Sequence, residues 1–136
     1  MTLTDTGPLV ALADRNDPAH FRCVASTKTL PKSPLLTTWP CFTEAMYLLD
    51  RAGGYRAQEE LWQLRRKEIV VLHRLTVAEG DRMDALMLQY KDIPMDLADA
   101  SLVAVAESLN LTRVFTIDNH FRAYRLGNHG VFEIVP

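Results

Sequence analysis

Short apolar runs alternate with longer amphipathic stretches along the whole chain. The segments predicted as strands are residues 1–5, 35–38, 69–72, 113–117 and 131–135. The run at 69–72, Ile-Val-Val-Leu, is typical of a strand that is buried on both faces. Apolar periodicity and helix boundary signals predict helices over 7–13, 17–28, 40–52, 55–67, 76–90 and 96–109, and a short helix after 119. Strands and helices that alternate in this way predict an α/β fold with a parallel sheet covered on both faces.

Proline and glycine mark several of the predicted boundaries. Asp17-Pro18 predicts an N-cap followed by proline at the first helical position. Gly53-Gly54 predicts the end of one helix, and the next helix is expected to begin at Tyr55. The chain contains no internal repeat, and its 136 residues suit a single domain over 1–136.

Composition and charge narrow the possible functions. No apolar run approaches the roughly 20 residues of a membrane span, and no signal segment opens the chain, so we expect neither membrane insertion nor secretion. Cys23 and Cys41 lack the spacing of a metal knuckle and are expected to be small apolar residues on helices, which fits a reducing cytoplasm. The net charge of −2 excludes binding to nucleic acid through overall charge. A polyanionic substrate would therefore have to meet local basic groups or a bound metal ion.

Acidic residues follow the predicted strands at one edge of the sheet. Asp5 ends the first strand, and Asp118 ends the strand predicted over 113–117. Glu44 lies in the first turns of the helix after residues 35–38, from which it can reach the same edge. Ligands of open α/β sheets bind beyond the carboxyl ends of the strands, so these acids are candidates for the functional site.

Two further acids lie at the start of the helix predicted over 96–109. Asp96 and Asp99 are three residues apart and therefore share one face of that helix near its N-terminus. Asp99 lies between apolar neighbours, Ala98 and Ala100, in a helix whose surroundings look buried. Because a buried carboxylate is costly without a partner, Asp99 requires a cation or strong hydrogen-bond donors.

Each acid taken alone also has a structural explanation. Asp5, Asp96 and Asp118 could cap the helices that follow them, and Glu44 could be a solvated helix residue. Four acids at one sheet edge would nevertheless repel one another unless a cation neutralised them. Oxygen ligands without cysteine or histidine favour Mg²⁺ or Mn²⁺, and these ions serve the hydrolysis of phosphodiesters.

The segments that carry these acids resemble the motifs of PIN-domain nucleases, and more particularly of VapC-type toxins of bacterial toxin–antitoxin pairs. They are residues 3–9 (LTDTGPL), 43–44 (TE), 97–100 (LADA) and 115–121 (FTIDNHF). The resemblance extends over essentially the whole chain and includes the order and spacing of the acids. Many relatives carry a charged residue after the last acid, where this chain has Asn119, which leaves the surroundings of the site open.

The resemblance implies a three-layer α/β/α sandwich with a mainly parallel central sheet. It implies a catalytic metal site for Mg²⁺ or Mn²⁺ made of four acids, with supporting roles for three further residues. It also implies endonucleolytic cleavage of RNA by a type II toxin, a cognate antitoxin that blocks the site, and a homodimer. The implied ligands are Asp5, Glu44, Asp99 and Asp118, and the implied supporting residues are Asp96, Thr6 and Thr116.

Three arginines are candidates for binding RNA phosphates or an acidic stretch of an antitoxin, although each could also be simply solvated. They are Arg15, Arg122 and Arg125. The four histidines, at 20, 73, 120 and 129, show no ligand spacing, and we expect no catalytic histidine. The alternative function is a catalytically silent PIN-fold module that binds a protein partner. A phosphatase of the haloacid dehalogenase type is disfavoured because Asp5 is followed by Thr6-Gly7 rather than by a second aspartate two residues on.

Overall fold

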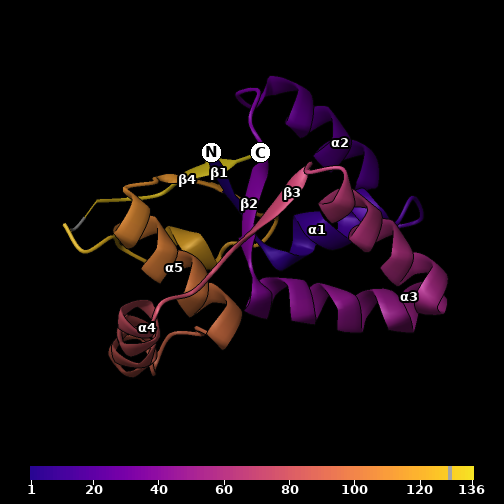
Figure 1. The fold of residues 1–136 in the computed structure, drawn as a ribbon. Helices are drawn as coiled ribbons and strands as arrows, with labels where there is room; N and C mark the ends of the chain where they lie inside the picture. Colours follow the sequence, from indigo (N-terminus) through magenta and orange to yellow (C-terminus); the bar gives the residue numbers. More distant parts are fainter. Residues whose placement is uncertain (129) are drawn as a thin grey trace.

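Five strands form one parallel sheet in the order β3-β2-β1-β4-β5, as a computed structural model of the chain shows (Figure 1). The structure describes residues 1–128 and 130–136, so the histidine at 129 lies outside the described residues. The strands are β1 (Thr2–Thr4), β2 (Leu35–Thr38), β3 (Val70–His73), β4 (Arg113–Phe115) and β5 (Glu133–Val135). The predicted parallel sheet is confirmed.

Helices cover both faces of this sheet. Figure 1 shows α1, α2 and α3 gathered on one side of the strands, and α4 and α5 on the other. The helices are α1 (Thr6–Ala13), α2 (His20–Thr29), α3 (Trp39–Arg66), α4 (Val77–Gln89) and α5 (Leu97–Leu109), with a short 3₁₀ helix, η1 (His120–Arg122). The predicted three-layer α/β/α arrangement is therefore confirmed. None of the helices in the described residues is long and apolar enough to cross a membrane.

The core is built around β1 and α5. All three residues of β1 are buried, and so is every residue of α5 from 98 to 106. A helix that is apolar on all sides is stable only when protein surrounds it. This packing carries Asp99, in the first turn of α5, into a largely apolar environment next to the sheet.

Two helix boundaries in the structure differ from those predicted from the sequence. Helix α2 begins at His20 rather than at Pro18, because the Asp17 side chain accepts a hydrogen bond from the Ala19 N–H and closes a turn before the helix. The two helices expected over 40–52 and 55–67 follow each other directly, as the two parts of α3. Gly54 separates them with a φ of 65°, a value that glycine adopts without steric cost.

Candidate metal centre

The carboxylate of Asp5 lies directly at the carboxyl end of the central strand β1. It is 4% exposed and forms the N-cap of α1. Its Oδ1 accepts a hydrogen bond from the Thr6 N–H at 2.8 Å, and its Oδ2 accepts one from the Thr116 hydroxyl at 2.9 Å. A carboxylate offers about four lone-pair sites, so both oxygens can still bind a cation. Capping and metal binding are therefore compatible roles for Asp5.

Asp99 projects toward the same edge from the first turn of α5. It is 5% exposed, and its Oδ2 accepts hydrogen bonds from the Tyr124 hydroxyl at 3.0 Å and from the Asp96 N–H at 3.3 Å. Asp96 in turn accepts a hydrogen bond from the Asp99 N–H at 2.8 Å, which completes a capping box. Asp96 thus forms the N-cap of α5, one of the two roles that its sequence position allowed.

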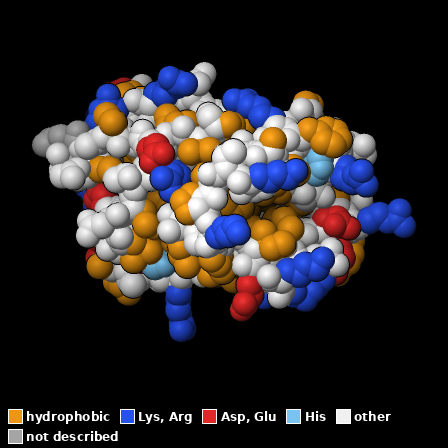
Figure 2. All heavy atoms as spheres, turned by 90° about the horizontal axis from the view of Figure 1, so that it is seen from above, with side chains coloured by type: hydrophobic (Ala, Val, Ile, Leu, Met, Phe, Trp, Pro, Cys, Tyr) orange, Lys and Arg blue, Asp and Glu red, His pale blue; other side chains and the backbone are white. Residues whose placement is uncertain are grey.

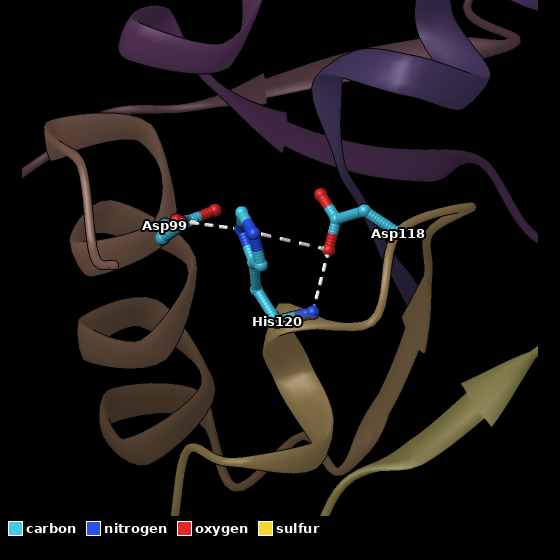
Figure 3. A group of neighbouring side chains, drawn as sticks. All are labelled: Asp99, Asp118 and His120. Atoms are coloured by element: carbon cyan, nitrogen blue, oxygen red, sulfur yellow. Dashed lines mark hydrogen bonds and ion pairs between the residues drawn. The ribbon is translucent and has the colours of Figure 1, made fainter. Parts of the chain in front are cut away.

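Asp118 follows β4, and the turn that contains it brings His120 beside the acids. The His120 N–H donates to Asp118 Oδ1 at 2.9 Å, and the Asp118 N–H donates to the Thr116 hydroxyl at 3.3 Å. The Nδ1 atom of His120 lies 3.8 Å from Asp118 Oδ1 and 3.8 Å from Asp99 Oδ2 (Figure 3). One ligand atom from each of these three residues lies within 4.8 Å of the other two.

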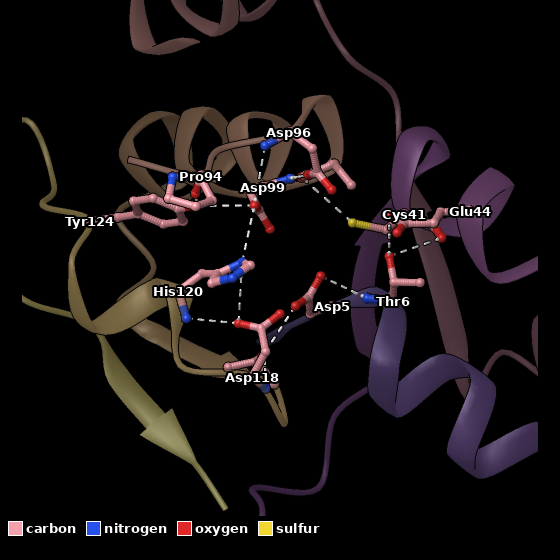
Figure 4. A network of polar contacts seen from close by, with 12 residues as sticks. Asp5, Thr6, Cys41, Glu44, Pro94, Asp96, Asp99, Asp118, His120 and Tyr124 are labelled. Carbon is pink, nitrogen blue, oxygen red and sulfur yellow. Dashed lines mark hydrogen bonds and ion pairs between the residues drawn. The ribbon is translucent and has the colours of Figure 1, made fainter. Parts of the chain in front are cut away.

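Glu44 stands at the rim of this centre. Its side chain is exposed in the first turns of α3, and its Oε2 accepts a hydrogen bond from the Thr6 hydroxyl at 3.1 Å. Figure 4 shows Asp5, Asp99 and Asp118 around a common space, with Glu44 beyond Thr6. The structure therefore brings Asp99 and Asp118 into one group of possible ligand atoms and places Asp5 beside this group. Glu44 is connected to Asp5 through Thr6.

Burial makes the centre electrostatically unfavourable without a cation. It raises the pKa of Asp5 to about 7, against the hydrogen bonds from Thr6 and Thr116, which lower it. Burial and the nearby Asp96 raise the pKa of Asp99 to about 6. Nearby Asp118 raises the pKa of both carboxyls. Such groups gain most from a positive charge placed between them.

The buried groups around the acids are held in their neutral forms. Burial, followed by the charge of Asp99, raises the pKa of Tyr124, so its hydroxyl stays protonated and acts as a donor. Burial and Asp5 raise the pKa of the Cys41 thiol to about 12, which rules out a thiolate nucleophile at neutral pH. Cys41 and Cys23 are both free and buried, as the sequence predicted.

The three candidate arginines differ in their settings. Arg15 follows the C-terminal end of α1, whereas Asp5 caps the N-terminal end of that helix. Arg125 donates from Nη1 to the carbonyl oxygens of Arg122 and Tyr124 and so holds its own loop together. Arg122 is exposed. Figure 2 shows one face of the molecule, on which basic side chains are scattered among apolar ones. Contact of the three candidate arginines with RNA stays a prediction.

Two residues at the centre, His120 and Tyr124, were not among the site residues predicted from the sequence. His120 was not predicted because the histidines lack the spacing of metal ligands. Its position two residues after Asp118 nevertheless indicated that it could lie near the predicted site. Tyr124 gave no such signal, because only the loop after η1 brings its hydroxyl to Asp99. Oxygen donors dominate the set, and two of the acids are buried. Among the described residues, no lysine or arginine forms an ion pair with Asp5, Asp99 or Asp118. These residues fit a hard divalent cation.

A protein-family model described as the PIN domain matches residues 2–126. The chain belongs to the PIN domain family. This PIN domain has the same fold as the crystal structure of VapC20 from Mycobacterium tuberculosis, a toxin that cleaves the sarcin-ricin loop. The TM-score is 0.83 at 18% sequence identity, over 100% of both chains. No curated protein matched the sequence of this PIN domain.

Proposed function

We propose that this PIN domain is a metal-dependent endoribonuclease and acts as the toxin of a type II toxin–antitoxin system. The observation that carries the proposal is the convergence of Asp5, Asp99 and Asp118 at the carboxyl edge of the sheet, two of them buried with raised pKa values. A silent scaffold has no physical need for such a cluster, because buried carboxylates cost stability unless a cation is bound.

The acids would hold one or two Mg²⁺ or Mn²⁺ ions, with Asp5, Asp99 and Asp118 as ligands and Glu44 at the rim. When bound, such an ion binds the scissile phosphate, lowers the pKa of the attacking water and stabilises the leaving oxygen. Thr116 holds the Asp5 carboxylate in place, and Thr6 connects Glu44 to it.

The shape of the centre suits a substrate that approaches from solvent. The side chain of Asp118 is 44% exposed, whereas those of Asp5 and Asp99 are buried. A phosphodiester can therefore reach the acids from the Asp118 side. Exposed Arg122, four residues further along the chain, is the nearest of the three arginines in sequence and the one we assign to phosphate binding.

The biological part of the proposal rests on the sequence motifs and on the shared fold with VapC20. We propose an RNA substrate in the cytoplasm, a cognate antitoxin that blocks the site, and a homodimer, with residues 1–136 as a single nuclease domain. An open groove of about 770 Å³ lies next to Glu44, lined by Trp39, Tyr47 and Leu97 among others, and it supports contact with a protein partner. Growth arrest on expression, relieved by the product of an adjacent small gene, would support the toxin assignment.

The test of the activity is cleavage of RNA by the purified protein. We expect cleavage with Mg²⁺ or Mn²⁺, none with EDTA, and loss of cleavage in Asp99→Asn. In-line attack by water, with the 3′ oxygen leaving, produces 5′-phosphate and 3′-hydroxyl ends. Ends with a 2′,3′-cyclic phosphate, or equal cleavage by the variant purified in the same way, would contradict the proposal.

A further inference from the structure

The imidazole of His120 lies between two carboxylates of the proposed metal centre. We propose that His120 Nδ1 is a ligand of the divalent ion held by Asp99 and Asp118, and that this nitrogen makes the centre prefer Mn²⁺ over Mg²⁺. The inference rests on the proposed function, because it concerns the ion of the same site. It adds a nitrogen to a ligand set that the sequence predicted to consist of oxygens alone.

The distances around His120 fit atoms that share an ion. Nδ1 lies 3.8 Å from an oxygen of Asp99 and 3.8 Å from an oxygen of Asp118. These separations are too long for hydrogen bonds. Ligands bonded to one ion at about 2.1 Å lie roughly 3 to 4.2 Å from each other, depending on the angle between them. An unprotonated ring therefore has no direct bond to either acid and lies where it can share an ion with both, whereas a protonated ring would form ion pairs with them.

The backbone after β4 fixes the position of His120 in the chain. The His120 N–H donates to Asp118 at 2.9 Å, and the next residue, Phe121, is 1% exposed and anchors η1 in the core. Figure 3 shows the ring between Asp99 and Asp118. Within the described part of the chain, no hydrogen bond is formed by a ring nitrogen of His120, so Nδ1 is available to an ion.

The chemistry of the donor atom decides the metal preference. Mg²⁺ prefers oxygen ligands and retains several waters, so it gains little from an imidazole. Mn²⁺ is also a hard ion that favours oxygen, but as a transition-metal ion it accepts an imidazole nitrogen more readily than Mg²⁺ does, so a mixed set of carboxylates and one imidazole favours Mn²⁺ of the two. The other histidines of the described chain are engaged elsewhere, His20 with the Ala11 carbonyl and His73 with the Glu79 carboxylate. They serve as internal controls.

The decisive experiment is pulsed electron paramagnetic resonance of Mn²⁺ bound to the full chain. We expect a ¹⁴N coupling of the imidazole type in the parent and in His20→Asn, and its loss in His120→Asn. Asparagine keeps a side-chain donor close to the Nδ1 position, so a role limited to positioning the carboxylates would survive the substitution. Calorimetry on the same proteins should show His120→Asn binding Mn²⁺ about 10-fold or more weakly, with Mg²⁺ affinity within about twofold of the parent.

Two results would overturn the inference while leaving the metal centre in place. One is saturable Mn²⁺ binding by the parent without a ¹⁴N coupling. The other is a His120→Asn variant that either keeps the Mn²⁺ affinity of the parent, as a positioning residue would, or loses affinity for Mg²⁺ and Mn²⁺ equally, which would show that the nitrogen does not select Mn²⁺. Failure of the parent to bind either ion would overturn the proposed nuclease together with the inference, so the failures are distinguishable.

Discussion

Asp5 should destabilise the metal-free fold above about pH 7, because its buried carboxylate is ionised there at a cost. Asp5→Asn replaces this group by a neutral amide of nearly the same shape. The amide oxygen can still accept from the Thr6 N–H, and the amide nitrogen can donate to the Thr116 hydroxyl, which then accepts. The substitution therefore removes the charge while it keeps both hydrogen bonds.

The size of the effect follows from the pKa of Asp5, which burial raises from 3.8 to about 7. One pKa unit corresponds to about 1.4 kcal/mol, so ionising Asp5 in the folded protein costs at most about 4 kcal/mol more than ionising it in the unfolded chain. Between pH 4 and pH 7 the folded state binds more protons than the unfolded state does. The free energy of unfolding of the metal-free parent should therefore fall as the pH rises through this window, and stay low above it.

Urea denaturation in EDTA, followed by circular dichroism at pH 4 and pH 8, measures this difference. We expect Asp5→Asn to match the parent at pH 4 and to be more stable by about 2 to 4 kcal/mol at pH 8. Saturating Mn²⁺ at pH 8 should stabilise the parent more than the variant, which lacks the Asp5 charge but keeps Asp99, Asp118 and His120. A variant less stable than the parent at pH 8 in EDTA would refute the argument that burial of this charge opposes folding.

The remaining predictions concern the support of the site and the kink in α3. Thr116→Val removes the hydroxyl that donates to Asp5, and it should weaken Mn²⁺ binding about 10-fold in calorimetry without changing the circular dichroism spectrum. Unchanged affinity would show that the hydroxyl does not orient the carboxylate. Gly54→Ala should cost about 1 to 3 kcal/mol in urea denaturation, because φ is 65° and ψ is −155° there. Gly80→Ala, in α4 with open space around it, should be neutral or stabilising, and equal effects of the two would contradict the backbone argument.

The sequence was sufficient for the sheet and for the acids that follow its strands. Short apolar or β-branched runs between helices marked the strands, including β1 with its sequence Thr-Leu-Thr, and residues that follow parallel strands emerge at the same edge of the sheet. Asp5 and Asp118 follow β1 and β4 in the structure, as the sequence predicted. Membership of the PIN family, expected from the motifs, is confirmed by the family model over residues 2–126.

Other features depended on contacts that a sequence pattern does not encode. Asp96 and Asp99 share a helix face, yet Asp96 caps the helix while Asp99 turns into the space beside Tyr124. The start of α2 depended on a local turn closed by Asp17 rather than on the proline after it. The place of His120 beside the acids depended on the turn after β4, which no periodicity reveals.

Calorimetric titration with Mn²⁺ tests the central claim most directly, which is that the acids at the carboxyl edge of the sheet form a metal centre. The parent should bind Mn²⁺ saturably, and Asp99→Asn should not. Asp96→Asn is the matched control, because asparagine is also a good N-cap and the Asp96 carboxylate is engaged in capping α5. We predict that it retains binding. No saturable binding by the parent, or equal binding by the parent and Asp99→Asn, would contradict the account.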